Sequence, residues 1–590
     1  MKFDFLGLTT LTILRRAQDF LAGEGIDVDV ERLPFDDTKT WDMLQKGDAG
    51  GVFQFEGQGM RDVLRQMQPD RIEDLIAAGA LYRPGPMANI PAYCARKHGE
   101  KWDVPHPELQ DILGETYGIM VYQEQVMSIA QRMAGYTLGG ADLLRRAMGK
   151  KIASEMEAQR QIFLDGATAR GIPAATAGEV FDLMAKFAEY GFNKPHAAAY
   201  AVVSWQTAWM KANHREAFIA ACMSLAINNT DRLASLRQEA SRMGISVLPP
   251  CINASDADFK LERQADGSFA IRYGLAAVKR VGLAAMRAVA AARGSRPFTS
   301  LADFAARVEP QALNKMQIEN LARAGAFDVL ESNRASIFAG AETLLRRAQA
   351  SSEERASGQG GLFAAVASEP EKLRLPVMPD WPPMDRLARE AEAIGFHLTA
   401  HPLDAYASVL RRLLVVPSNR LAQRAEAGAA RVRLAGLVLG AKERFTRTGT
   451  RMAWVRLSDS GGSYEITVFS ELLSRAREML ATGNAVLVEA EIRLEGEALR
   501  ITANQVSLLD AAAAQAGGGY RVWLARTEAV EHIRSLLDRE GRGRGRIVLV
   551  PRLAEGQEVE VTLPGGWSLS PRLAQAMKLL PGVERVDDLV

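Results

Sequence analysis

The chain has 590 residues, of which 47% are hydrophobic and 24% are charged, and its formal net charge is +1. This length exceeds what one hydrophobic core supports and predicts roughly four domains of about 150 residues each. The near-zero net charge excludes a protein that binds nucleic acid through its overall charge, so such binding must come from local basic patches.

The cysteines are widely spaced and form no CxxC pair. This pattern argues against a disulfide framework and against a zinc ribbon, and it fits a reducing cytoplasm. The sequence contains no run of about 18 apolar residues, and its N-terminus lacks the pattern of a signal peptide. We therefore expect a soluble, cytoplasmic protein that has no contact with a membrane.

Residues 1–8, MKFDFLGL, alternate between apolar and polar side chains and predict a short strand that ends at Gly7. Thr9 or Thr10 is expected to cap the helix that follows. A lone strand cannot satisfy its backbone or bury its faces, so we expect its sheet partners upstream, outside this chain.

The helical period dominates from about Thr38 to Met243, with interruptions by turn signals such as RPGPM at 83–87. The stretch LPPCINAS at 248–255 marks the next boundary, and short β-like runs and further helices follow it. Residues 351–370 are polar and rich in glycine and alanine, which predicts a flexible linker.

The hydrophobic period changes to two between 431 and 510, where five strand-like runs carry one helix between the third and the fourth. This order predicts an oligonucleotide-binding (OB) type β-barrel. Residues 511–519 predict a second linker, and a small α/β module closes the chain at 520–590, with GRGRGR at 541–546 as a basic loop. The expected fold class is therefore multidomain α+β, with a mostly helical first part.

Two blocks of the helical part, 117–151 and 190–200, combine cations with aromatic residues and glycine turns. Their polar residues are Arg145, Arg146, Lys150, Lys151, Asn193, Lys194 and His196. Neighbouring cations repel one another unless a polyanion lies between them, and phosphate is the usual one. The blocks therefore predict a site for a nucleotide triphosphate and a nucleic-acid backbone. The alternative is a solvated basic helix face followed by an ordinary capped helix.

Other cations are candidates for contacts with backbone phosphates. They are Arg83 in YRPGPM, Arg96 and Lys97 in RKHG, and Arg444, Arg447 and Arg451 in the predicted barrel. In the barrel these arginines alternate with aromatic residues, a combination typical of single-strand binding. A basic surface loop in the first two cases, and a barrel with its aromatic residues in the core, are the alternatives.

Several long blocks resemble the bacterial DNA polymerase III alpha subunit, a replicative C-family DNA polymerase, and occur in the order of that family. They are KFDFLGL at Lys2, VFQFEGQGM at Val52, YRPGPM at Tyr82, RKHG at Arg96, YQEQVMSIAQ at Tyr122, YTLGGADLLRRAMGKK at Tyr136 and GFNKPHAAAYA at Gly191. The resemblance implies template-directed DNA synthesis from primer–template DNA and dNTP, with Mg²⁺ as the cofactor. It also implies that Arg145, Arg146 and Lys150 neutralise the triphosphate.

The resemblance implies roles for further residues. Asp4 matches a palm aspartate that binds the catalytic metal, whereas its pattern alone fits a solvent-facing strand residue. The stretches GLAAVKRVG and LARAGAF resemble a tandem helix-hairpin-helix (HhH) module, in which Lys279 and Arg280 would meet the DNA backbone. The family usually has glycine at the position of Arg280, which puts the amide cradle of that hairpin in doubt.

A short motif in the predicted linker matches the QxxLF form by which the family binds the beta sliding clamp. Its residues are Gln359, Leu362 and Phe363. The family's terminal module contacts the clamp-loader tau subunit. An exposed leucine and phenylalanine in a polar linker suit insertion into an apolar cleft of a partner, and the alternative is a linker that touches its own domain.

The expected domains follow from these matches. They are a palm remnant strand at 1–8, polymerase fingers at 9–250, the HhH region at 251–350, the linker at 351–370, a connecting segment at 371–430, the OB-fold at 431–510 and the accessory domain at 520–590. Two further palm aspartates of the family are absent, so we expect the chain to be inactive alone. The alternative function is that of a non-catalytic DNA- and sliding-clamp-binding protein.

Overall fold

The computed structural model describes residues 7–150, 153–187, 190–357, 373–426, 428–445, 449–495, 498–552 and 559–589. The chain divides into two units. The first comprises Met1–Val247 with Ser255–Gly274, and the second comprises Leu248–Ala254 with Leu275–Val590. No helix within the described ranges combines the length and the apolar character that crossing a bilayer requires.

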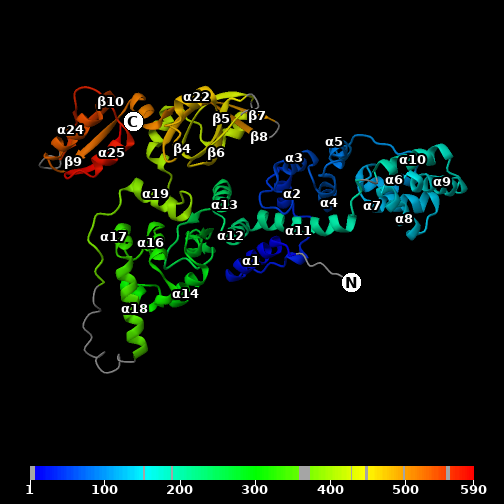
Figure 1. Ribbon diagram of the computed structural model, residues 1–590, viewed down its shortest axis with the longest axis horizontal. Helices are drawn as coiled ribbons and strands as arrows, with labels where there is room; N and C mark the ends of the chain where they lie inside the picture. Colours follow the sequence, from blue (N-terminus) through cyan, green and yellow to red (C-terminus); the bar gives the residue numbers. More distant parts are fainter. Residues whose placement is uncertain are drawn as a thin grey trace. The chain divides into compact units, whose positions relative to one another are not determined.

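The first unit is built around α11 (Lys194–Asn213), the long helix of Figure 1. It contacts α1 (Thr9–Gly23), α2 (Thr38–Gln45), α4 (Ile72–Leu81) and α12 (Arg215–Leu225). Trp205 of α11 is fully buried and packs against Trp41 of α2, with ring centroids 4.4 Å apart. The same core includes residues of α3 (Gln58–Met67) and α5 (Ile90–Lys97).

A second core of this unit lies among the next five helices. They are α6 (Glu108–Leu113), α7 (Gln123–Ala134), α8 (Leu138–Lys150), α9 (Ala153–Ala169) and α10 (Ala174–Phe187). Phe163 and Phe181 form its centre, with ring centroids 5.7 Å apart. Gly166 lets α9 approach α7 closely, because a Cβ at this position would lie 2.2 Å from the carbonyl oxygen of Ala134.

The start of α1 differs in detail from the expectation. The helix begins at Thr9, but its N-cap is Leu8 and no side chain caps it. The prediction that Thr9 or Thr10 is the cap is therefore wrong, since both residues lie inside the first helical turn. Residues 1–6 of the expected strand lie outside the described ranges. The unit also contains α13 (Thr230–Arg242) and the antiparallel pair β2 (Lys260–Arg263) and β3 (Phe269–Arg272).

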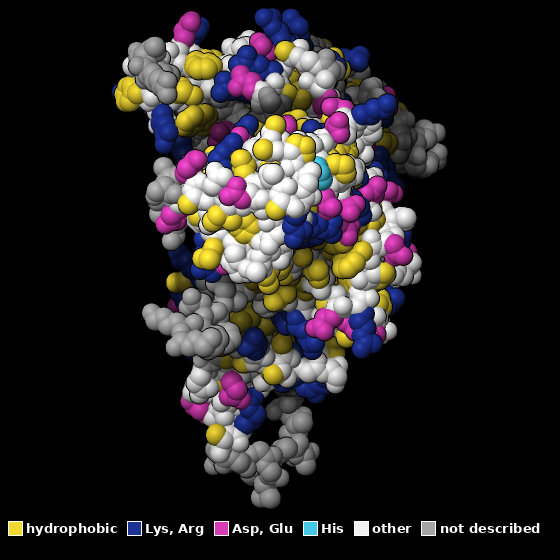
Figure 2. Space-filling model, turned by 90° about the vertical axis from the view of Figure 1, so that its right-hand side faces the viewer, with side chains coloured by type: hydrophobic (Ala, Val, Ile, Leu, Met, Phe, Trp, Pro, Cys, Tyr) yellow, Lys and Arg dark blue, Asp and Glu magenta, His cyan; other side chains and the backbone are white. Residues whose placement is uncertain are grey.

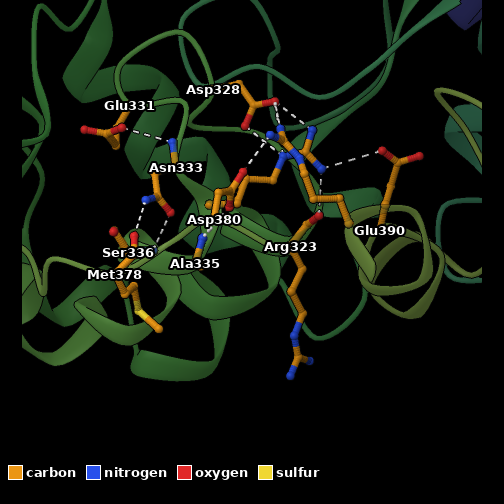
Figure 3. A network of polar contacts seen from close by, with 11 residues as sticks. Arg323, Asp328, Glu331, Asn333, Ala335, Ser336, Met378, Asp380 and Glu390 are labelled. Atoms are coloured by element: carbon orange, nitrogen blue, oxygen red, sulfur yellow. Dashed lines mark hydrogen bonds and ion pairs between the residues drawn. The ribbon is translucent and has the colours of Figure 1, made fainter. Parts of the chain in front are cut away.

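The second unit begins with a helical region. Its helices are α14 (Leu283–Arg293), α15 (Leu301–Arg307), α16 (Lys315–Arg323), α17 (Arg334–Ala339) and α18 (Ala341–Ser357), and α19 (Pro383–Ile394) follows in the segment expected to connect it to the barrel. The nearly buried guanidinium of Arg334 donates to Asp328 through Nε and Nη2 and to the carbonyl of Arg323 through Nη1 (Figure 3). Arg386 of α19 donates to Asp328 and Asp380, so one polar cluster joins α16, α17 and α19.

The β-barrel has the predicted composition of five strands and one helix. Its elements are β4 (Ala430–Phe445), β5 (Arg451–Asp459), β6 (Gly462–Phe469), α22 (Ser470–Ala476), β7 (Ala485–Glu495) and β8 (Ala498–Leu508). The barrel closes in the order β4-β5-β6-β8-β7. Alternate side chains of each strand, including Val455, Ile466 and Val488, fill its core, which explains the period of two.

Both the second linker and the basic loop are wrong predictions. Residues 511–519 instead contribute to α23 (Leu509–Gln515), which buries Leu509 and Ala512 beside barrel residues, and to the start of β9 (Gly518–Leu524). Alanine favours a helix and can be buried, so an alanine run need not be a linker. GRGRGR lies almost entirely in β10 (Arg542–Pro551), which pairs in parallel with β9.

The terminal module is a four-stranded sheet in the order β11-β10-β9-β12. It includes α24 (Ala529–Glu540), β11 (Val561–Thr562), α25 (Pro571–Lys578) and β12 (Val583–Asp588). Both helices share one hydrophobic core with the sheet. Residues 351–357, which were expected in the first linker, belong to α18, and residues 358–370 of that linker lie outside the described ranges.

Candidate nucleotide- and DNA-binding site

The turn after α4 and the loop before α11 lie side by side in the first unit. Gly85 packs against the ring of Tyr190, and a Cβ at this glycine would lie 2.4 Å from that ring. The guanidinium of Arg83 stacks on Phe192, with its Cζ 3.8 Å from the ring centroid. A pocket of about 300 Å³ opens beside this contact. Its lining includes Gln54, Phe55, Tyr82, Arg83, Phe192, His196 and Tyr200.

Arg83 is the main charged group of this pocket. Partial burial lowers the pKa of its guanidinium, because water stabilises the positive charge less well there. No carboxylate of the described ranges lies within ion-pair distance of Arg83. An anion in the pocket would therefore meet a positive charge that no acidic group of the described chain neutralises.

Aromatic rings form one wall of the same pocket. The imidazole of His196 stacks on Tyr200 one helical turn further along α11, with centroids 4.4 Å apart and an interplanar angle of 25°. Phe192 meets His196 edge-on, with ring centroids 5.5 Å apart. The ring of Phe53, which is not a lining residue, lies 5.5 Å from that of Tyr200. Flat rings beside a cation suit a base or sugar next to its phosphates.

The first turn of α11 is held by an acidic residue of α7. Asn193 is the N-cap, and its Oδ1 accepts the N–H of His196. Glu124 accepts the N–H of Lys194 through Oε2, at 2.9 Å, and the side-chain amide of Asn193 through Oε1, at 2.8 Å. The Lys194 ammonium pairs with Glu115 Oε2 at 2.6 Å. Carboxylates of the chain thus occupy the donors that the sequence assigns to phosphate.

The adjacent arginines of α8 are paired in the same way. Asp142 Oδ1 accepts from Nε and Nη2 of Arg145 at 3.0 and 2.8 Å, and Oδ2 lies 2.8 Å from Nη2 of Arg146. Hydrogen bonds from Arg145 and the charge of Arg146 lower the pKa of Asp142 below its ordinary value. Figure 2 shows this mixing more widely, with basic and acidic side chains next to one another over the face drawn.

The structure brings the two cation-bearing blocks together at the start of α7. Tyr122 and Phe192 form a parallel β-bridge, and Gln123 contacts both Gly191 and Arg145. Sequence reasoning missed Gln123 and Glu124, because an uncharged or acidic side chain next to a basic block gives no phosphate signal. Lys150 ends α8, and its side chain is not described, while Lys151 lies outside the described ranges.

The two cations of the RKHG motif, Arg96 and Lys97, bind to groups of the protein itself. Lys97 is only 6% exposed, and its ammonium lies 2.7 Å from Asp70 Oδ1 and 2.9 Å from the fully buried Asp74 Oδ2. Arg96 donates to the carbonyl of Tyr117 at 3.0 Å. Both cations therefore hold neighbouring segments together, which differs from the expected contact with DNA.

The hairpin before α14 exposes Lys279 and Arg280. Arg280 has a φ of +60°, so it adopts the left-handed conformation that glycine usually supplies. Two hydrogen bonds anchor the backbone of the hairpin at Lys279. The N–H of Lys279 donates to the carbonyl of Ala393, and the carbonyl of Lys279 accepts from the side-chain amide of Asn320. The shape of the hairpin is thus retained although an arginine replaces the expected glycine.

The β4–β5 hairpin of the barrel carries exposed aromatic and basic groups together. Phe445 is 68% exposed, and the Arg451 guanidinium lies 5.4 Å from its ring centroid. Arg444 lies 5.5 Å from the ring of Trp454. Such a surface can stack a base and contact its phosphate. Arg447 lies outside the described ranges.

Besides Lys151 and Arg447, four further candidate residues lie outside the described ranges. They are Asp4, Gln359, Leu362 and Phe363. Within the part of the chain that the structure describes, no three or more His, Cys, Asp or Glu side chains converge on a position for a metal ion.

Three family models match the sequence. The model of the bacterial DNA polymerase III alpha subunit finger domain matches residues 10–171, which include α7 and α8. A helix-hairpin-helix motif matches residues 244–337, and an OB-fold nucleic acid binding domain matches residues 432–509. The pocket, the strained hairpin and the barrel thus each lie wholly or partly in a region with a match.

Curated proteins named DNA polymerase III subunit alpha are similar along the chain. The protein from Caulobacter vibrioides is 44% identical over 595 residues, covering 100% of this chain and 51% of its own length. The protein from Neisseria meningitidis serogroup B is 42% identical, covering 87% and 44%, and that from Vibrio cholerae is 37% identical, covering 100% and 52%. The chain spans about half the length of the curated relatives it matches.

Proposed function

Since the chain belongs to the bacterial DNA polymerase III alpha subunit family, we propose that it receives the incoming nucleotide and holds DNA in a replicative polymerase. In the whole enzyme the reaction is template-directed transfer of a nucleotide from dNTP to the 3′-hydroxyl of a primer. The alternative of a non-catalytic DNA- and clamp-binding protein is not favoured, because the relatives are named as the polymerase subunit.

The observation that carries this proposal is the pocket around Arg83. A half-buried guanidinium stacked on Phe192, next to the paired rings of His196 and Tyr200, suits a nucleotide. The aromatic surface offers contact for base or sugar, and the cation offers charge for a phosphate.

Arg145, Arg146 and Lys194, which are paired with carboxylates of the chain, would extend this site when a triphosphate binds. A triphosphate carries more charge than one carboxylate, so it can replace Asp142 on Arg145 and Arg146 and Glu115 on Lys194. Lys150, Asn193 and His196 complete the proposed nucleotide-binding set, and Lys151 the adjacent DNA contact. The exchange of one anion for another avoids burial of an unneutralised charge.

DNA contacts are proposed for the HhH hairpin and the barrel. Lys279 and Arg280 would meet the duplex backbone, and Arg444, Arg447 and Arg451 would meet single-stranded template. For Lys97 and Arg96 we now favour the interior contacts described above over phosphate. For Arg83, predicted from the sequence as a contact to the DNA backbone, we now propose the nucleotide instead.

Mg²⁺ enters the proposal through Asp4, which would share the metal with carboxylates from elsewhere in the polymerase. The metal would supply charge neutralisation for the phosphates during transfer. Asp4→Asn in a full-length alpha subunit that carries this sequence is expected to abolish primer extension while leaving DNA binding intact. Unchanged extension would remove Asp4 from the metal site.

Two protein partners and a location complete the proposal. Gln359, Leu362 and Phe363 would bind the beta sliding clamp, and the terminal α/β module would bind the clamp-loader tau subunit. Both partners act with chromosomal DNA in bacteria, so the proposed location is the cytoplasm.

Calorimetric titration of dATP into the chain tests the nucleotide site. Arg83→Ala is expected to weaken binding about ten-fold, since a charge-assisted contact contributes about 1.5–3 kcal/mol. Arg132→Ala is the matched control, because this half-exposed arginine pairs with Asp111 at 3.4 Å and does not line the pocket. Equal affinity in all three proteins, or no binding by the unmodified chain, would contradict the proposal.

A further inference from the structure

Gln123 joins the two blocks of the nucleotide site through a single side-chain amide. Its Oε1 accepts from Nη1 of Arg145 at 3.2 Å, and its Nε2 donates to the carbonyl of Gly191 at 2.9 Å. Its own backbone N–H donates to the carbonyl of Phe192 at 2.9 Å. One residue at the start of α7 thus contacts the α8 arginine and the loop before α11.

We propose that Gln123 is a positioning residue for the incoming nucleotide, which sets Arg145 relative to the Phe192 wall of the pocket. This inference rests on the proposed function, because it assumes that Arg145 meets the triphosphate. Gln123 itself acts through the arginine and contributes no charge.

The contacts of Arg145 explain why such a residue is useful. Asp142 engages Nε and Nη2 from the same helix, and Gln123 engages the remaining nitrogen, Nη1, from another helix. When a triphosphate replaces Asp142 on Nε and Nη2, Gln123 would still hold Nη1, so the guanidinium loses less freedom on binding the anion. Arg146 is 62% exposed, and the contact identified for it is with Asp142, so it is less constrained.

The amide is the side chain that this position requires. It must accept from a cation at one atom and donate to a carbonyl at the other, and a neutral amide does both. Glutamate could keep the first contact but would place a negative oxygen against the carbonyl of Gly191. It would also neutralise Arg145 more strongly than the amide does, which weakens the attraction for phosphate.

Gly191 supports the same arrangement. A Cβ at this position would lie 3.1 Å from Cγ of Gln123 and 3.1 Å from the ring of Phe187, so the absence of a side chain at Gly191 lets Gln123 pack closely against its backbone. The β-bridge beside it, in which the N–H of Phe192 donates to the carbonyl of Val121 at 3.1 Å, keeps this backbone in register. Gln123 is therefore hydrogen-bonded to the loop at one end of its amide and to Arg145 at the other, so the position of the loop fixes that of the arginine.

The test is a double-mutant cycle on dATP binding, measured by calorimetry with the 590-residue chain. Gln123→Met keeps the length of the side chain and removes both polar contacts, and Gln123→Glu keeps its shape. Each is expected to weaken binding about ten-fold, as for the loss of one hydrogen bond to a charged group. In an Arg145→Ala background Gln123→Met is expected to have less than about a two-fold effect, because the group that Gln123 positions is gone.

Gln125→Met is the control for a purely structural role. Gln125 lies on the same helix and accepts the N–H groups of Val121 and Tyr122, but it does not contact Arg145. Its effect on dATP affinity should therefore persist unchanged in the Arg145→Ala background. An unfolding temperature well above that of the titration, measured for each variant, ensures that the dATP affinities of folded proteins are compared.

The outcomes separate the inference from the function on which it rests. If Arg145→Ala weakens binding and the Gln123 variants do not, or their effects simply add to that of Arg145→Ala, the positioning role is overturned and the nucleotide site stands. If Arg145→Ala binds dATP like the unmodified chain, the triphosphate role of this arginine fails and the inference fails with it.

Discussion

Arg280 adopts a backbone conformation that few residues with a Cβ accept. Its φ of +60° carries strain on the order of 1–3 kcal/mol, and the side chain is exposed, so little packing offsets that strain. Nη1 of Arg280 lies 3.7 Å from the sulfur of Met316, which is a weak contact. A phosphate contact would give a functional reason to keep an arginine at a position suited to glycine.

Arg280→Gly is accordingly expected to stabilise the protein and to weaken DNA binding. Relief of the strain outweighs the extra unfolded-state entropy of glycine, about 0.5–1 kcal/mol, so the unfolding free energy should rise by about 1 kcal/mol. The slope of log affinity for duplex DNA against log salt should fall by about 0.9, as for one lost phosphate contact. Urea unfolding and fluorescence anisotropy measure the two effects.

Leu414→Gly is the matched control for this prediction. Leu414 has a φ of +54° and is 78% exposed, so glycine should relieve comparable strain there. It should leave DNA binding unchanged. A variant of Arg280 that binds duplex DNA like the parent would show that the strained arginine has another purpose.

Lys97 leads to the opposite expectation. Lys97→Met removes the ammonium partner of the fully buried Asp74 and leaves Arg71, at 3.4 Å, as its cation, which should lower the unfolding free energy by about 2 kcal/mol. The DNA affinity of the folded variant should not change. Lys279→Met, at an exposed lysine of the HhH hairpin, should lower the DNA affinity and leave the unfolding free energy unchanged. A clear loss of DNA affinity with Lys97→Met at full stability would restore the phosphate contact predicted from the sequence.

Among the elements of the first unit, α11 and α13 are joined by a partly buried charge cluster. The ammonium of Lys211, which is fully buried, lies 2.8 Å from Asp48 Oδ1 and 2.9 Å from Glu239 Oε1, and Arg242 pairs with the same two acids. Burial alone would raise the pKa of Glu239, but hydrogen bonds from Arg242 and the charge of Lys211 lower it to about 2.

This cluster predicts a specific loss of stability in acid. The Glu239 carboxyl has a lower pKa in the folded state than its ordinary 4.5, so its contribution is complete above about pH 5 and declines as the pH falls towards 2. Glu239→Gln should lower the unfolding free energy at pH 7 by about 3 kcal/mol and flatten its decline between pH 5 and pH 3. Urea unfolding over this range measures both, and a parallel pH profile for the variant would contradict the assignment.

The β4–β5 hairpin is the part of the barrel best suited to a single strand. Phe445→Ala should weaken single-stranded DNA binding about ten-fold, because stacking on a base contributes about 1–3 kcal/mol, while the salt dependence stays the same. Leu579→Ala, at a leucine that is 67% exposed in the terminal module, should have no effect. Fluorescence anisotropy at several salt concentrations distinguishes these results. If Phe445→Ala binds single-stranded DNA as tightly as the unmodified protein, the DNA must bind to another face of the barrel.

At the scale of the whole molecule, local periodicity predicts the elements well. The period of two, broken by one helix, indicates a closed barrel, and the structure has one. GRGRGR could not be recognised as a strand, because its pairing with β9 and its close approach to Trp567 depend on distant segments. A Cβ at Gly543 would lie 2.6 Å from the carbonyl oxygen of Trp567, a constraint that no local pattern contains.

The same limit applies to the candidate site. Basic residues are visible in a sequence, but the acids that pair with them are not. Lys97 is separated by 27 residues from Asp70 and Lys194 by 79 residues from Glu115. Arg83 is the opposite case, a cation with no acidic partner in the described ranges. Only the fold shows this, together with the stacking of Arg83 on Phe192. A net charge of +1 over 590 residues fits such extensive pairing.

Photo-crosslinking with 8-azido-dATP, followed by peptide mapping, tests most directly whether the segments around Arg83 and His196 form the nucleotide site. The label should appear in peptides that contain residues 82–87 or 190–200, and an excess of unmodified dATP should suppress it. Labelling confined to the barrel or to the terminal module, with none in those peptides, would contradict the account.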